Sequence, residues 1–202
     1  MNDETDLARL ARIADSVFAV VVTLLAYRVR LPSREALAAL DGQALEPFLA
    51  DLGAVVLSFL VAALFWMAHW RVFRLLRRAD VGLVALHFAF LGALVLLPLS
   101  TSLMSNASGR SAAGPCAYSA NLFLLAGAQT LFRARARRLQ PEAFIGVRAL
   151  LTPALLTLVF AVAAVAALAS PWASRALWCA SFLTPIVERR WGLGRGAPPV
   201  SG

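Results

Sequence analysis

The stretch RLARIADSVFAVVVTLLAY, residues Arg9–Tyr27, decides the fold. It is an almost unbroken apolar segment, long enough to cross a bilayer core of about 30 Å at about 1.5 Å per residue. Asp15 lies roughly one turn inside it, with Arg9 and Arg12 upstream. A carboxylate costs about 2.5–3.5 kcal/mol at the centre of a membrane helix and less near an end. We therefore expect Asp15 to have a partner and a role.

The composition of the whole chain is that of a membrane protein. Of its 202 residues, 60% are hydrophobic and 15% are charged, whereas a soluble domain has roughly 25% charged residues. The net charge of +8 comes from arginine alone, and the arginines lie at the ends of apolar runs, which argues against nucleic-acid binding. The acidic N-terminus and the lack of a small-residue cleavage site argue against a signal peptide, so the first helix should remain in the mature protein.

Six apolar segments are long enough to span a membrane. We predict an all-α integral membrane protein with one transmembrane domain, residues 1–190, followed by a flexible tail at 191–202. In the third segment, Pro98 should kink the helix and leave a carbonyl for Ser102 or for water. The predicted spans are about 12–30, 50–73, 81–104, 115–133, 145–169 and 172–188.

The arginines also predict an orientation. If the N-terminus is inside, most of the 19 arginines fall in cytoplasmic segments. The positive-inside rule then places both termini in the cytoplasm of a multi-pass protein of the cell membrane. In the first outer loop, the pattern REALAALDGQALEPFL at Arg34–Leu49 is compatible with a short amphipathic helix on the outer surface, and a solvated loop without a role is the alternative.

Signatures of several other functions are missing from the sequence. It has no GxSxG, HExxH, GxxxxGK[ST] or TVGYG-like stretch, so we expect neither an enzyme nor a channel with a carbonyl filter. The histidines, His69 and His87, have no clustered carboxylate and predict no metal site. Cys116 and Cys179 lack CxxC spacing and should act as small hydrophobic residues. We expect no cofactor.

The side chains of the first span sort by helical spacing. Ser16, Val20, Thr23 or Leu24, and Tyr27 follow one another on one stripe of a helix. A stripe of medium aliphatic side chains with a hydroxyl beside it can line a narrow pore, where an apolar constriction gates by losing its water. Ordinary helix packing is the alternative explanation of the same pattern.

Four stretches resemble helices of the prokaryotic members of the transmembrane protein 175 family, the endosomal and lysosomal potassium channels. ADSVFAVVVTLL at Ala14–Leu25 is similar to the first-helix signature R-x-x-x-F-S-D-x-x-x-A, which continues with an isoleucine and then T-L-L. FWMAHWRVFRLL, LVLLPLSTSLM and YSANLFLLAGAQTLF resemble the second, third and fourth helices. The resemblance covers roughly residues 9–135.

The resemblance assigns positions within the signature. Arg9, Asp15 and Ala19 stand at its arginine, aspartate and alanine, and His69 stands at the histidine of the second helix. In the presumed pore, Val20 stands at the isoleucine, Leu24 at a pore-lining leucine one turn later, and Tyr27 at a position where a further leucine is common.

The family implies a homotetramer of six-helix subunits in the lipid bilayer, with the first helices around a central pore for K⁺ or other monovalent cations. Four copies of Val20 and Leu24 would form two apolar rings, and Thr23 hydroxyls nearby could replace part of an ion's hydration shell. We predict a leak-type, potassium-permeable channel without a carbonyl filter. A small secondary transporter or a non-conducting membrane subunit is the alternative.

Asp15 has two possible roles in such a channel. As a structural group, it would pair with Arg12, or with Arg9 across helices, and would reach His69 at the inner end of the pore helix. As a functional group, it would present its charge to the permeating cation. We favour the structural role, in which these four residues form one polar network.

Several residues depart from the family signature. Ile13 and Ala14 replace its phenylalanine and serine, Ser16 replaces a glycine, and His87 stands at what looks like an asparagine of the third helix. Val20 is one methylene smaller than the usual isoleucine, so its ring should be wider. We therefore predict weaker discrimination of potassium over sodium than is normal for the family.

Overall fold

The computed structural model describes residues 3–27, 29–39, 42–106, 111–144 and 148–181. All regular structure in these ranges is helical, which confirms the all-α class. The elements are α1 (Asp3–Tyr27), α2 (Arg34–Ala39), α3 (Gly42–Phe73), α4 (Val81–Val95), α5 (Leu97–Asn106), α6 (Ala113–Leu139), the 3-10 turn η1 (Pro141–Ala143), α7 (Arg148–Ala169) and α8 (Pro171–Ser181).

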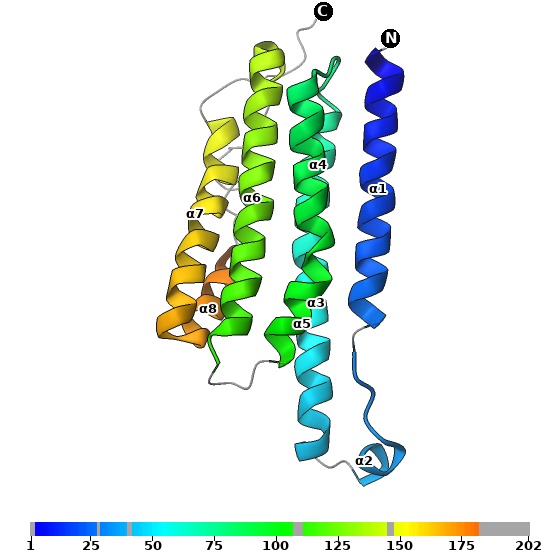
Figure 1. Ribbon diagram of the computed structural model, residues 1–202, viewed down its shortest axis with the longest axis vertical. Coiled ribbons are helices and arrows are strands. Elements are labelled where there is room, and N and C mark those ends of the chain that lie inside the picture. The colour runs from blue at the N-terminus through cyan, green and yellow to red at the C-terminus, as the bar shows by residue number, and fades with distance from the viewer. Residues whose placement is uncertain (1–2, 28, 40–41, 107–110, 145–147, 182–202) are drawn as a thin grey trace, which may run out of the picture.

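The helices form an elongated bundle (Figure 1). α6 packs against α4, α5 and α7, whereas α1 contacts α3, α4 and α5 and lies along one edge. α7 and α8 lie at the opposite edge, and α2 lies beyond the end of α1, beside the start of α3. This arrangement leaves one side of α1 without a neighbour within the described chain.

Three helical stretches are long and apolar enough to cross a membrane: Thr5–Tyr27, Leu45–Phe73 and Val81–Ser105. They lie at the first three predicted spans, and α6, α7 and α8 lie at the positions of the other three. A further apolar stretch in α7, Pro153–Ala169, is shorter. The end of the sixth predicted span, 182–188, and the predicted tail at 191–202 lie outside the described residues, and the number of spans stays a prediction.

The connection between α1 and α3, which we predicted to be the first outer loop, contains the short helix α2, and α3 starts earlier than the predicted second span. An ion pair fastens the chain after α1 to the side of α3. The Nε atom of Arg30 donates to Oδ2 of Asp51 at 2.8 Å, and its second guanidinium nitrogen donates to Oδ1 at 3.0 Å. Asp51 is buried, so the pair holds the two segments in one fixed geometry.

A capping residue begins α4 and connects it to α6. Asp80 has an extended backbone, and its Oδ1 accepts a hydrogen bond from the backbone N–H of Leu83 at 2.8 Å. Its Oδ2 accepts one from Nε of Arg135 at 3.0 Å. The Arg135 guanidinium, together with the Leu83 N–H, lowers the pKa of the Asp80 carboxyl. Gly82 leaves room for this guanidinium, because a Cβ there would lie 3.2 Å from Nε of Arg135.

The third predicted span is interrupted at Leu96, between α4 and α5, which confirms the kink expected at Pro98. Proline has no N–H to donate to the carbonyl of Leu94, and its ring crowds that carbonyl. The regular helix therefore ends one turn before the proline and restarts at Leu97.

The carbonyl of Leu94, for which we predicted Ser102 or water as the donor, accepts from the backbone N–H of Leu96. Asn121 of α6 bridges the rest of the break. With the amide oriented as its neighbours require, Nδ2 donates to the carbonyl of Ala93 at 2.9 Å and Oδ1 accepts from the N–H of Leu97 at 3.2 Å. A side chain of another helix thus replaces a missing rung of the backbone ladder.

The core of the bundle is aromatic and aliphatic. The ring of Phe90 lies 6.0 Å from that of Phe18 on α1 and 6.2 Å from that of Phe65 on α3, measured between centroids. Lipid tails are as apolar as these side chains, so the contacts stabilise the bundle through van der Waals packing more than through removal from water.

Candidate functional site

The first helix has one packed face and one open face. Val20 is 58% exposed, Leu24 46% and Tyr27 88%, and the Thr23 side chain lies beside them. The structure therefore places the four predicted pore residues on one side of α1, away from the bundle. The packed face is made of Ala14, Phe18, Val21 and Leu25.

Two hydroxyls follow the same open side of α1. Thr23 Oγ1 donates to the carbonyl of Ala19 at 2.8 Å, and Ser16 Oγ donates to the carbonyl of Arg12 at 2.9 Å. Each hydroxyl proton is therefore used within the helix. A hydroxyl oxygen keeps lone pairs after donating its proton, so both oxygens can still face water or a cation.

Asp15 has a partner that the sequence did not suggest. Its Oδ1 accepts a hydrogen bond from the indole Nε1 of Trp66 at 2.8 Å. The Nε of Arg12 instead donates back along α1 to the carbonyl of Ala8 at 3.1 Å. Within the described chain, the indole from α3 takes the place that we predicted for Arg12 and His69, while a pairing with Arg9 across subunits stays a prediction.

His69 belongs to a different, buried polar chain. Its Nδ1 lies 2.8 Å from Oε1 of Gln129 on α6, and its Nε2 lies 3.1 Å from Nδ1 of His87 on α4. The His69 ring is stacked between Phe90 and Phe132, with centroid distances of 4.4 and 4.6 Å. The three polar side chains are all buried, and they connect α3, α4 and α6.

The amide oxygen at the end of this series of hydrogen bonds determines which atom donates in each of them. With the Gln129 amide oriented so that Oε1 faces His69, this oxygen can only accept, so His69 donates from Nδ1 and accepts at Nε2. His87 must then donate from Nδ1. The Nε2 atoms of His87 and of Gln129 are both buried with no hydrogen-bond partner in the described structure. The described residues contain no group of three or more side chains suited to hold a metal ion.

The sequence of α6 did contain a signal for these buried hydrogen bonds and for the amide that bridges the break between α4 and α5. Asn121, Leu125 and Gln129 follow one another at a spacing of four residues, and so share one face of a helix. Two amides on the buried face of an apolar helix need partners, because an unsatisfied polar group in a bilayer costs several kcal/mol.

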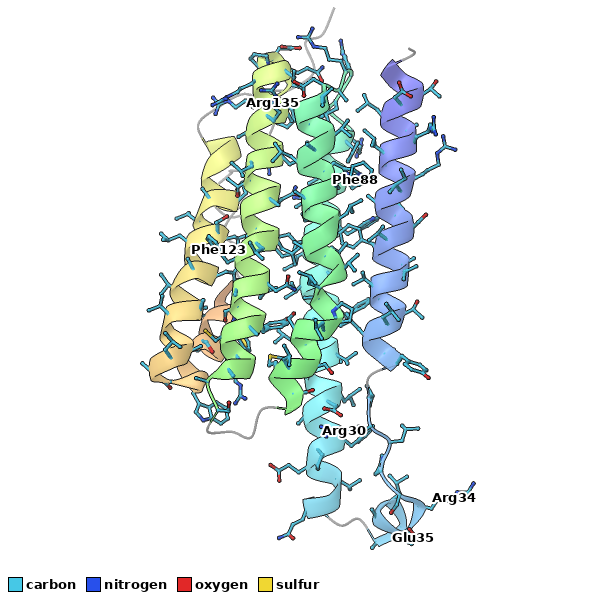
Figure 2. The ribbon with its side chains drawn as sticks, viewed as in Figure 1. Arg30, Arg34, Glu35, Phe88, Phe123 and Arg135 are labelled. Atoms are coloured by element: carbon cyan, nitrogen blue, oxygen red, sulfur yellow. The ribbon has the colours of Figure 1, made fainter. Side chains whose placement is uncertain are left out.

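Charged side chains gather at the two ends of the bundle. Figure 2 places Arg135 at one end and Arg30, Arg34 and Glu35 at the other. The start of α1 lies at the same end as Arg135 (Figure 1). The arginines near the start of α1, the end of α3 and the end of α6 thus lie toward one end of the molecule.

Comparisons with known proteins match this architecture. The sequence model of a family described as the endosomal/lysosomal potassium channel TMEM175 matches residues 9–98. The chain is 30% identical over 97 residues to a potassium channel of Streptomyces collinus, a match that covers 48% of this chain and 47% of the relative. The chain thus spans about half the length of this curated relative.

The fold also has a counterpart among solved structures. A crystal structure described as a lysosomal potassium-selective channel TMEM175 homolog from Chamaesiphon minutus matches with a TM-score of 0.78. The match covers 92% of this chain and 98% of that chain at 18% identity, so it shows the fold. Together with the match over residues 9–98, it confirms the resemblance seen in the sequence.

Proposed function

Because the chain is a member of the TMEM175 family, we propose that it is a potassium-permeable cation channel of the leak type. In this proposal, four copies surround a central pore in the cell membrane, and each contributes the open face of α1. Both termini and the arginine-rich end of the bundle lie in the cytoplasm.

The observation that carries the proposal is the two-faced packing of α1. Its inward face is buried in its own subunit, whereas Val20, Leu24 and Tyr27 remain open. Val20 and Leu24 lie one helical turn apart, so four copies would give two stacked apolar rings. Apolar rings of this kind form a constriction, and a cation can pass through it only when the constriction is filled with water.

The polar groups near these rings fit a cation pathway. Thr23 lies between Val20 and Leu24 in sequence, and the lone pairs of its hydroxyl oxygen remain available. Asp15 lies nearer the start of α1 and is held by Trp66. We propose that Asp15 mainly positions α1 against α3, and that Val20, Thr23, Leu24 and Tyr27 contact the permeating ion.

Potassium flux into proteoliposomes tests this function. The wild type should conduct, and Val20→Ala and Leu24→Ala should conduct faster, because each replaces a ring residue by a smaller one. Val165→Ala, at an exposed position of α7, is the matched control and should leave the flux unchanged. If the wild type and both ring variants show no potassium flux, the protein is not a channel.

A further inference from the structure

A cavity of about 100 Å³ lies between α3, α6 and α7. One water molecule needs only about 10–15 Å³ measured in this way, so the space is several times larger. Its walls are mostly apolar and include Val61 and Phe65 of α3 and Phe160 of α7. It lies apart from the open face of α1.

Nitrogen-bearing side chains line the same cavity. Gln129, Arg71 and Arg133 are part of its wall. Gln129 is 2% exposed, and its Oε1 contacts His69, whereas its Nε2 has no hydrogen-bond partner among the described residues. A buried amide donor without an acceptor is costly, so the cavity can stabilise a ligand that supplies one.

The polar and apolar groups are separated along the cavity. Val61 and Arg71 lie about 15 Å apart along α3 at about 1.5 Å per residue. α3 and α6 run in the same direction (Figure 1), so Arg71 and Arg133 both lie toward the arginine-rich end. The apolar wall at Val61 and Phe160 lies deeper in the bundle. A ligand must therefore be anionic or rich in acceptors at one end and apolar at the other.

We propose that this cavity binds a long-chain anionic amphiphile. Its anionic oxygens would accept hydrogen bonds from Gln129, Arg71 and Arg133, and its chain would lie between α3, α6 and α7. A basic pocket between membrane helices is suited to such a headgroup. A fatty-acid carboxylate and an alkyl phosphate share this chemistry. The site is independent of ion conduction, so it can be tested without measuring flux.

Photolabelling of the full chain in phosphatidylcholine nanodiscs tests the proposal. The probe is dodecanoate with a diazirine on its last carbon, and labelled peptides are mapped by mass spectrometry. Labels are expected on cavity residues of α3, α6 or α7. Unlabelled dodecanoate and dodecyl phosphate should both displace the probe. The compound that displaces it at the lower concentration identifies the preferred headgroup. Neutral dodecanol should not displace the probe.

Two arginine variants, one in the last turn of α3 and one just after its end, separate binding at this site from general attraction of the probe to the membrane. Arg71→Gln should raise the competitor concentration needed for displacement roughly tenfold, because a charge-assisted hydrogen bond is lost. Arg74→Gln is the matched control, since Arg74 is exposed, lies over Trp70 and is not part of the cavity wall. Equal competition by dodecanol, or equal effects of the two variants, would overturn the proposal.

Discussion

The Nε2 atom of His69 and the Nδ1 atom of His87 lie 3.1 Å apart inside the bundle. Both rings are buried, and Gln129 determines which atoms donate. His69 lies on α3 and His87 on α4, so the hydrogen bond joins two helices that the chain connects through a short turn at one end of the bundle.

This geometry predicts the tautomer of both imidazoles. In the neutral rings, we expect the proton on Nδ1 of His69 and on Nδ1 of His87, with both Nε2 atoms unprotonated. Solid-state ¹⁵N NMR of histidine-labelled protein in lipid distinguishes the two nitrogen types. Gln129→Leu removes the acceptor of the His69 proton, so His69 should no longer prefer the tautomer with the proton on Nδ1. A proton on Nε2 of His69 in the wild type would contradict the hydrogen-bond direction.

The contact between Trp66 and Asp15 should contribute to stability. Trp66→Phe keeps the ring but removes the indole N–H, so we expect a loss of about 0.5–1.5 kcal/mol, near the lower end because Asp15 is exposed. Thermal unfolding in detergent and the fraction of intact oligomer report the change. Trp70→Phe, which removes an indole stacked on Trp66, is the control. Equal effects of both substitutions would mean that the hydrogen bond to Asp15 contributes nothing.

The side chain at position 20 should set ion discrimination. We expect Val20→Ile to raise the permeability of potassium relative to sodium, because the added methylene narrows the ring. Reversal potentials in planar bilayers under a potassium/sodium gradient measure the ratio. Val165→Ile, on the exposed side of α7, should leave it unchanged. Strong potassium selectivity already present in the wild type would show that the wider ring does not weaken discrimination.

The carboxylate of Asp80 should stabilise the protein in a pH-dependent way. Its pKa is lower in the folded chain than the usual value of about 3.9. The contribution is therefore complete above about pH 4 and is lost as the pH falls through the folded pKa. Asp80→Asn should lower the unfolding temperature at pH 7, and the deficit should shrink below about pH 4. Glu142→Gln, at an exposed site, is the control. A deficit that is the same at both pH values would argue against the ion pair with Arg135.

The amide of Asn121 should contribute to the free energy of unfolding mainly when the break between α4 and α5 is present. Asn121→Leu removes the bridge between Ala93 and Leu97, and we expect a cost of about 1–3 kcal/mol. Pro98→Ala allows a continuous helix, so the same substitution should cost less in that background. A double-mutant cycle of unfolding free energies measures this coupling. Additive effects would show that Asn121 and the break are energetically unconnected.

Helical periodicity predicted one stripe of side chains on α1, and the family resemblance indicated that this stripe faces a pore and not a neighbouring helix. The spacing of Val20, Leu24 and Tyr27 predicts one stripe, and these side chains do lie on one open side. A stripe is a local property, because the turn of the helix determines it. Periodicity does not say what covers that face, so the pore remains a proposal.

Contacts between helices were less accessible from the sequence. Local reasoning paired Asp15 with Arg12, three residues away on the same helix, but the indole of Trp66 on α3 reaches it in the structure. The pairing of His69 with His87 likewise depends on which faces of α3 and α4 meet. That choice follows from the packing of the whole bundle, and no spacing within one helix determines it.

The amide that closes the gap between α4 and α5 also affects the order in which the protein can be completed. The carbonyl of Ala93 and the N–H of Leu97 find their partner on α6, which the ribosome makes later. Until α6 docks, these backbone groups need water or another temporary partner. The third apolar stretch therefore reaches its final form only after the chain that follows it has been inserted, and biogenesis of the N-terminal half depends on residues outside it.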